Sequence, residues 1–301
     1  MSNNFMAFTN RIDVAPNISI GLKLGEQIEK YGDSKMMYDL ASLTKVFCGV
    51  LVIKLAELNY FKLDHQVNQY MSIKSNVTIR QLLIHTSGFT DEMLEIKSES
   101  QQIINWSDKE NSTGTIKYAD INYIILYQLI SKFGDYEQLL DKFVTTNLDI
   151  VYKPNKDIYT FAPTELRANR GLVSGEVHDN KAYKMGEISG HAGLFANIDS
   201  LIAFFYRLVN GEIIQVEYFN DFSYKRNLLF ETQNSLGQMG NFECKGSFHS
   251  GFTGTSVLID FEEKQFIIIL TNRISPSRLN SNIFNFRQEV HNNFYKRCKG
   301  E

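Results

Sequence analysis

Near both ends of the chain, apolar and polar positions alternate with the two-residue period of β-strands. The segment "ISIGLKLG" (18–25) has this alternation, and "EQIEKYG" (26–32) follows it directly, which predicts a pair of strands. Toward the other end, "SVLIDFEEKQFIIILTNR" (256–273) predicts two more strands, joined by a turn at 261–264. The pattern therefore predicts β-structure at both ends of the chain.

Between these strands, longer apolar runs predict helices. The run "SLTKVFCGVLVIKLAELN" (42–59) is apolar on nearly all sides, which predicts a buried helix, and Asn59 stands where a left-handed C-terminal cap would fall. A second helix, at 78–85, opens with Thr78 and Gln81 at the spacing of a capping box. Further helices are predicted at 120–134, 199–211 and 282–298.

This order of elements predicts an α+β fold. An antiparallel sheet built from both chain ends would be flanked by helices and would carry an inserted, mostly helical lobe. We expect the sheet lobe to take in about 1–60 and 245–301, and the helical lobe about 61–244. The chain has four prolines and no Pro/Gly/Ser-rich linker, so a single domain over 1–301 is expected.

Composition narrows the possible partners and compartments. The 301 residues are 43% hydrophobic and 22% charged, as in a folded soluble protein, and the net charge of −3 argues against nucleic acid or an anionic membrane as partner. No signal peptide and no membrane span is expected, because the chain has no basic start followed by a long apolar stretch. Three scattered cysteines, Cys48, Cys244 and Cys298, fit a reducing cytoplasm better than a disulfide framework or a zinc site.

Ser42 and Lys45 form a Ser-x-x-Lys pair at the start of the predicted buried helix. Positions three apart share one face of a helix, so the two side chains could meet. A serine hydroxyl becomes a strong nucleophile only when a base takes its proton, and a lysine can serve if burial or a nearby cation lowers its pKa. A helix-capping serine followed by a solvated lysine would have the same spacing, so the pair alone leaves both interpretations open.

Two later segments add candidate chemistry. Tyr118 in "KYADINY" comes two residues before Asp120, the expected helix cap, and could either face a cleft or pack as an ordinary aromatic. The segment "GSFHSGFTGTSVLID" places His249, Ser250 and Gly251 at the beginning of an expected edge strand. Glycine there would let a substrate backbone approach closely, although a surface histidine on a glycine-rich strand would fit the segment too.

In this order, Ser-x-x-Lys, Tyr-Ala-Asp and His-Ser-Gly resemble the motifs of the serine β-lactamase/penicillin-binding-protein superfamily. The closest likeness is to its class C β-lactamase-related branch, which includes D-stereospecific aminopeptidases, DD-carboxypeptidases and esterases. Further phrases support the resemblance, which covers about 18–290: "DLASLTKV", "LLIHTSGF", "GEVHD" and "SGHAGLF". It implies the DD-peptidase/β-lactamase-like form of the predicted α+β fold.

The resemblance also implies roles for individual residues. Ser42 would be the acylated nucleophile, and Lys45 and Tyr118 would together move its proton to the leaving group. The backbone N–H groups of Ser42 and Phe252 would form the oxyanion hole, and water would hydrolyse the acyl-enzyme without a metal or other cofactor. His249 would take the place of the family's strand lysine. The expected substrate-binding residues are Asp120, His249, Ser250 and Gly251.

Two departures from the family pattern affect the expected substrate. Asp120 stands where β-lactamases usually have asparagine, and a carboxylate cannot donate an N–H to a substrate amide. His249 removes a fixed positive charge that would attract a substrate carboxylate. The sequence therefore favours a serine hydrolase of D-amino-acid peptides, amides or esters. The alternatives are a carboxylesterase, a weak β-lactamase, or a catalytically idle homologue that binds a ligand as a sensor; the oligomeric state stays open.

Other residues have more ordinary interpretations. His178, Asp179, His191 and His249 could be imagined as zinc ligands, but no metal-binding spacing supports that set, and His191 is expected to shape a tight loop. Substrate specificity would lie in the loops at 89–116 and 212–247, with Trp106 as a possible contact. Two residues are expected to be structural: Cys48 in the core, and Ser87, whose "HTSGF" context is not Gly-x-Ser-x-Gly.

Overall fold

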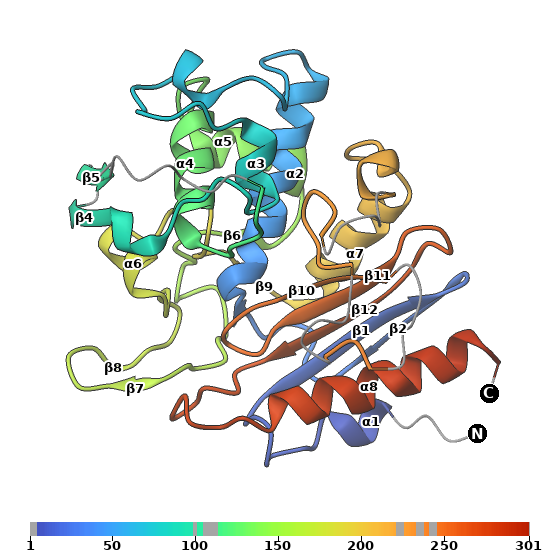
Figure 1. Cartoon of the computed structure of the whole chain (residues 1–301). Helices are drawn as coiled ribbons and strands as arrows, with labels where there is room; N and C mark the ends of the chain where they lie inside the picture. Colours follow the sequence, from blue (N-terminus) through green and yellow to red (C-terminus); the bar gives the residue numbers. More distant parts are fainter. Residues whose placement is uncertain are drawn as a thin grey trace.

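A computed structural model of the chain describes residues 5–98, 101–104, 114–220, 226–232, 238–240 and 246–300. Its central feature is a five-stranded antiparallel sheet in the order β10-β11-β12-β1-β2 (Figure 1). The strands are β1 Ile18–Leu24, β2 Gln27–Tyr31, β10 Gly246–Ser250, β11 Ser256–Asp260 and β12 Gln265–Thr271. Cys244, Trp106 and much of the two predicted specificity loops lie outside the described residues.

The two ends of the chain meet in the middle of this sheet. Strand β1 pairs with β12 from Ile18 opposite Thr271 onward, so N-terminal and C-terminal strands are direct neighbours. The turn predicted at 261–264 joins β11 to β12, with Asp260 opposite Gln265. The predicted α+β sheet built from both chain ends is confirmed.

Helices cover both faces of the sheet. Helices α1 (Phe5–Phe8) and α8 (Ile283–Cys298) lie on one face, and α7 (Ile198–Val209) lies on the other (Figure 1). Strand β1 is therefore buried along most of its length, although its alternating sequence would also fit a strand with one face exposed to solvent. Gly21 makes this possible, because a Cβ there would lie 2.7 Å from the Ile202 side chain.

The remaining helices gather to one side of the sheet (Figure 1). Helix α2 is buried at every position from 44 to 53, as its apolar sequence predicts. Asn59 adopts the predicted left-handed conformation after it, with φ of 63°, and the capping box of Thr78 and Gln81 is formed. The helices are α2 Thr44–Glu57, α3 Ile79–Leu83, α4 Asp120–Ile130, α5 Tyr136–Leu140 with a π-helical continuation at Asp141–Thr145, and α6 Asn180–Lys184.

Short elements complete the described structure. Three two-residue strands form a small sheet in the order β3-β9-β6: β3 Tyr38–Asp39, β9 Phe195–Ala196 and β6 Ile150–Val151. Two hairpins are formed by β4 Leu94–Ser98 with β5 Gln101–Ile104, and by β7 Leu166–Arg167 with β8 Gly171–Leu172. Single 3-10 turns lie at Ala41–Leu43, Val67–Gln69, Asp91–Met93 and Val216–Phe219.

Three predicted boundaries are wrong. The helix expected from Ser42 begins at Thr44, because Ser42 lies in a separate 3-10 turn. Asp120 is the first residue of α4 and Ala119 is its cap, so Tyr118 precedes the cap by one residue. The helix expected to run to 134 ends at Ile130.

The expected division into a sheet lobe and a helical lobe stays a prediction.

Within the described part of the chain, the helices are too short or too polar to cross a bilayer.

Candidate active site

Ser42 lies at the point where strand β3 turns into helix α2. The residue before it, Ala41, has a φ of 47°, in the left-handed region that residues with a Cβ rarely adopt. The buried carboxylate of Asp39 holds this turn by accepting a hydrogen bond from the Ala41 N–H at 2.8 Å. The turn directs the Ser42 side chain into a pocket, although the serine is not itself the first residue of the α-helix.

The Lys45 side chain is completely buried beneath Ser42. Its Nζ atom donates to Ser42 Oγ at 3.1 Å, to Asp120 Oδ1 at 2.8 Å and to the His191 carbonyl at 3.2 Å. The three donor positions of an ammonium group therefore all have acceptors. The solvated-lysine interpretation of the Ser-x-x-Lys pair is wrong.

The charge of Lys45 follows from these neighbours. Burial by itself lowers the pKa of Lys45, but the Asp120 carboxylate and Tyr118 oppose it, and the net pKa is raised above the ordinary value. To act as a base, Lys45 would need burial or a nearby cation to bring its pKa down. That condition is not met, because the anion of Asp120 lies against the ammonium.

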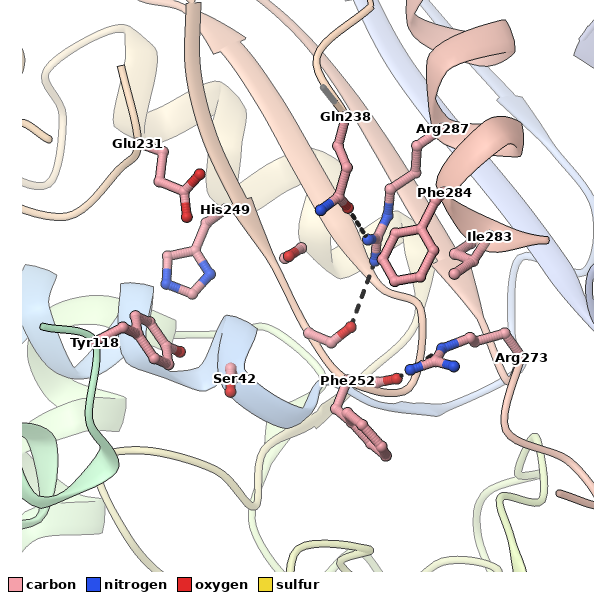
Figure 2. A pocket seen from close by; sticks show the side chains of 12 residues that line it. Ser42, Tyr118, Glu231, Gln238, His249, Phe252, Arg273, Ile283, Phe284 and Arg287 are labelled. Atoms are coloured by element: carbon pink, nitrogen blue, oxygen red, sulfur yellow. Dashed lines mark hydrogen bonds between the residues drawn. The ribbon is translucent and has the colours of Figure 1, made fainter. Parts of the chain in front are cut away.

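Tyr118 lies on the loop before α4 and faces the same pocket (Figure 2). Its ring stacks on His85 with 4.4 Å between centroids, and Lys45 Nζ lies 5.0 Å from the centre of the ring. His85 is buried with a φ of 59°, and its Nδ1 accepts from the Ala119 N–H at 3.3 Å. His85 thus supports Tyr118. Its only sequence signal was its place in the phrase "LLIHTSGF".

Asp120 lies between two lysines. Its Oδ1 accepts from Lys45, and its Oδ2 lies 2.6 Å from Lys181 Nζ, which also contacts Asp91 Oδ2 at 2.7 Å. Burial raises the pKa of Asp120, but Lys45, His191 and Lys181 together lower it by more. The net pKa is therefore well below the ordinary value. Lys181, on α6, was not singled out by the sequence, because no local motif connects it to the site.

His249, Ser250 and Gly251 lie at the far end of edge strand β10, not at its beginning as predicted. Gly251 packs directly on the segment before Ser42: a Cβ at this position would collide with the Leu40 carbonyl. The Thr255 hydroxyl, from the residue just before β11, donates to the same carbonyl at 2.9 Å. These contacts hold the end of β10, and Phe252 after it, beside the Ser42 turn.

His249 is buried, so the alternative of a surface histidine is wrong. Within the described residues, neither of its ring nitrogens has a hydrogen-bond partner, and the ring lines the pocket. Burial, Arg226 and Lys45 together hold the pKa of His249 well below its usual range, so the ring is neutral. A buried neutral imidazole with free nitrogens can donate to or accept from a ligand.

The pocket has a volume of about 470 Å³ and extends from Ser42 to the start of α8 (Figure 2). At its far end are two buried guanidinium groups, Arg273 and Arg287, whose hydrogen-bond partners are carbonyl and amide oxygens. Among the described residues, no carboxylate pairs with either. The lining residues are Ser42, Tyr118, Glu231, Gln238, His249, Ser250, Gly251, Phe252, Arg273, Ile283, Phe284 and Arg287.

The structure separates the residues imagined as zinc ligands. Asp179 and His191 do lie together, with Oδ1 and Nε2 2.9 Å apart, and Asp120 is near both. Lysine ammonium groups, however, already contact both oxygens of Asp120. His178 instead bonds Glu165 at 2.9 Å, and His249 faces the pocket alone.

Ser87 and Cys48 have the structural surroundings expected of them. Ser87 is buried, and its hydroxyl donates to the Asn122 side chain at 2.6 Å. Cys48 is buried in α2 among the core residues. Neither residue lines the pocket.

The family model described as beta-lactamase matches residues 29–288, which is most of the chain. The chain belongs to the beta-lactamase family. Within that family, a Salmonella typhimurium protein named "Putative D-alanyl-D-alanine carboxypeptidase" is 27% identical, over 82% of this chain and 73% of the relative.

Solved structures share the beta-lactamase fold. A class C beta lactamase from Rhodobacter sphaeroides superposes with a TM-score of 0.74 at 14% identity, over 98% of this chain and 99% of its own. A penicillin binding protein from Bacillus halodurans gives 0.68 at 12%, over 92% and 96%. EstCE1, a hydrolase with promiscuous acyltransferase activity, gives 0.70 at 13%, over 94% and 97%. At these identities the likeness establishes the fold alone, and members of the family are generally hydrolytic enzymes.

Proposed function

We propose that this beta-lactamase family member is a serine hydrolase that works through an acyl-enzyme on Ser42. The observation that carries the proposal is the 3.1 Å contact between Ser42 Oγ and the buried Lys45 ammonium, at the edge of a pocket shared with Tyr118. A serine and a phenol that line one pocket, with a buried cation against the serine, form a set of groups suited to acyl transfer.

In this proposal Lys45 acts as a fixed cation, since its pKa is raised. We assign the proton exchange to Tyr118, which accepts the proton as the phenolate, with the Lys45 ammonium 5.0 Å from the centre of its ring. As Ser42 Oγ attacks the substrate carbonyl carbon, its proton passes to Tyr118. Tyr118 then gives that proton to the leaving group as the tetrahedral intermediate breaks down.

The negative charge that forms on the carbonyl oxygen needs donors close by. We assign this role to the backbone N–H groups of Ser42 and Phe252, because Gly251 presses the end of β10 against the turn that carries Ser42. A water molecule then attacks the acyl carbon and gives a proton to Tyr118, and Ser42 leaves with a proton in return.

The charge of the pocket bears on the substrate. The sequence suggested that His249 had removed the positive charge needed to attract a carboxylate, yet Arg273 and Arg287 line the same pocket without a carboxylate partner in the described part of the chain. A peptide with a free C-terminal carboxylate would supply that partner. Together with the name of the Salmonella relative, this favours D-amino-acid peptides as the substrate class.

One observation favours a second candidate, an esterase. Asp120 is not among the residues that line the pocket, and both of its oxygens contact lysines, so it is not placed to accept from a substrate amide N–H. An ester lacks that N–H and leaves no donor unpaired. Turnover of D-alanyl peptides compared with matched D-alanyl esters separates the two candidates, and turnover of a β-lactam tests for weak β-lactamase activity.

The nucleophile is tested by mass spectrometry after incubation with a fluorophosphonate. The expected result is a single adduct that maps to Ser42 and is absent from Ser42→Ala. Ser87→Ala is a suitable control, because this buried serine lies outside the pocket. If wild type forms no adduct with a fluorophosphonate, a β-lactam or an activated ester, the catalytic proposal gives way to an idle ligand-binding homologue.

A further inference from the structure

Four side chains of alternating charge extend from Ser42 toward the surface. Lys45 Nζ contacts Asp120 Oδ1 at 2.8 Å, Asp120 Oδ2 contacts Lys181 Nζ at 2.6 Å, and Lys181 Nζ contacts Asp91 Oδ2 at 2.7 Å. The exposed fraction of the side chain rises outward along the series, being 0% for Lys45, 16% for Asp120, and 31% and 35% for Lys181 and Asp91. Only the inner end of the series touches Ser42.

The position of Lys181 is fixed by its own helix. Asp179 caps α6, and its carboxylate accepts from the N–H groups of Lys181 and Ala182 at 2.9 and 2.8 Å. Asp91 is held in turn, because its Oδ1 accepts from the Ile121 N–H on α4 at 3.0 Å. The Lys181 ammonium therefore lies between two carboxylates, of Asp120 and Asp91, that are both held at the start of α4.

Lys181 balances a charge that is unusual at this place. The Asp120 carboxylate is partly withdrawn from water, and a carboxylate oxygen in such a place is costly when it has no partner. Lys45 satisfies Oδ1 of Asp120, and Lys181 satisfies Oδ2. With Lys181 in place, the Asp120 carboxylate cannot rotate away from Lys45 without losing a contact.

Resting on the proposed function, we propose that Lys181 is a positioning residue: it holds the Asp120 carboxylate in the orientation that fixes the Lys45 ammonium beside Ser42 Oγ. It does so without touching the reacting atoms. Asp120 and Lys181 then act as one unit, a charge-balanced pair on α4 and α6. An asparagine at position 120 would be neutral and would not need the lysine.

Other charged and titratable groups surround this unit and enter its pH dependence. Asp120 is faced by Lys45, Lys181, His191 and Asp179. Beyond Asp120, Lys45 faces Tyr118, Tyr123, Cys48, His85 and His249. Arg226 lies over the other partner in this set, the Tyr118 ring, at 5.9 Å from its centre. Since Lys181 is among the groups that lower the pKa of Asp120, its loss would move that pKa upward.

The test compares rates of Ser42 modification by a fluorophosphonate across pH. We expect Lys181→Met to slow the reaction by at least about tenfold at neutral pH. This is less than the loss of about 10²–10⁴-fold typical when an acid–base group is removed, because Lys181 does not touch the reacting atoms. Its acid limb should move to higher pH as Asp120 becomes easier to protonate. Lys181→Arg should retain most of the rate, because it restores the cation. Lys184→Met, an exposed lysine on the same helix, is the matched control and should behave as wild type.

A double-mutant cycle distinguishes positioning from a merely structural role. Asp120→Asn combined with Lys181→Met removes both charges, so the double variant should be faster than the product of the two single effects predicts, and its shifted acid limb should disappear. Additive effects, an unshifted acid limb in Lys181→Met, or no rescue by Lys181→Arg would overturn the proposal.

The same cycle read by urea unfolding needs no activity. It separates failure of this inference from failure of the proposed function. Coupling between positions 120 and 181 in stability, with no reaction at Ser42 in any variant, would refute the serine-hydrolase proposal and show that the Asp120–Lys181 pair contributes to stability alone. Should Lys181→Met not fold, Lys181→Gln provides the neutral variant for both measurements.

Discussion

Gly251 lies so close to the carbonyl oxygen of Leu40 that a residue with a side chain does not fit at position 251. A Cβ on Gly251 would overlap both that oxygen and the Thr255 hydroxyl, so the backbone itself would have to move. This contact joins strand β10 to the turn that carries Ser42. It connects the two regions of the chain that contribute the proposed oxyanion-hole donors.

Gly251→Ala is therefore expected to impair catalysis more than folding. Separating β10 from the Ser42 turn displaces the Phe252 N–H, and loss of one oxyanion-hole donor costs about 10²–10³-fold in rate. The measurement is kcat on an activated ester, with thermal unfolding as the check on folding. Gly25→Ala, at a turn with open space around it, controls for loss of a glycine elsewhere. A Gly251→Ala enzyme with wild-type kcat would contradict the proposed hole.

Tyr118→Phe should remove the proton carrier and leave the pocket nearly unchanged in shape. We expect a loss of about 10²–10⁴-fold in kcat, the usual range for a general acid–base group. Stopped-flow acylation with an activated ester measures the step directly. Tyr206→Phe, an exposed tyrosine on α7, is the matched control. A near-wild-type rate for Tyr118→Phe would show that another group moves the proton.

Lys45→Met should be similarly damaging, for an electrostatic reason. Without the ammonium, the Asp120 carboxylate loses one of its two lysine partners, and Tyr118 loses the cation that lies 5.0 Å from the centre of its ring. We expect a rate loss of orders of magnitude together with a lower unfolding temperature. A stable variant that still turns over at the wild-type rate would remove Lys45 from the mechanism.

Arg273→Gln should reduce discrimination between charged and neutral substrates. We expect wild type to prefer D-alanyl-D-alanine peptides with a free C-terminal carboxylate over the same peptides as amides. The variant should lose at least about tenfold of that preference, because a buried guanidinium–carboxylate contact is worth this much or more. Rates for neutral esters should change little. Equal loss for both peptide forms would argue against a carboxylate at this end of the pocket.

Asp39 should make stability fall as the pH rises through mildly acidic values. Burial raises the pKa of Asp39 to about 6 from its ordinary 3.8, so the folded state binds this proton more tightly than the unfolded state does. The contribution is complete below pH 3.8 and is lost as the pH passes 6, an effect of about 3 kcal/mol. Urea unfolding of wild type and Asp39→Asn from pH 4 to 7 measures it. Parallel stability curves would contradict the assignment.

Much of the fold could be predicted because its signals are local. The period of the strand at 18–25, the turn at 261–264 and the apolar run at 42–59 each depend on a few neighbouring residues. Boundaries were harder to predict. The sequence predicts that a helix begins at Ser42, but Ser42 lies in a separate 3-10 turn. The backbone just before Ser42 is held by Asp39 and by the end of strand β10.

The candidate site was predicted in part for the same reason. Ser42 and Lys45 are three positions apart on one helical path, so their contact follows from spacing. Lys181, Arg287 and His85 were missed, because each reaches the site through packing between elements far apart in the chain. A residue of this kind carries no motif of its own.

The sequence by itself determined the main strands and the longer helices, that both chain ends share one sheet, and that a serine and a lysine meet at the start of a buried helix. Only the tertiary structure decided the charge of that lysine. Burial alone would have favoured the neutral amine, but the fold places Asp120, 75 positions away, at 2.8 Å from it. An electrostatic interaction depends on distance in space and on exclusion of water, and neither is written in the spacing of residues along a chain.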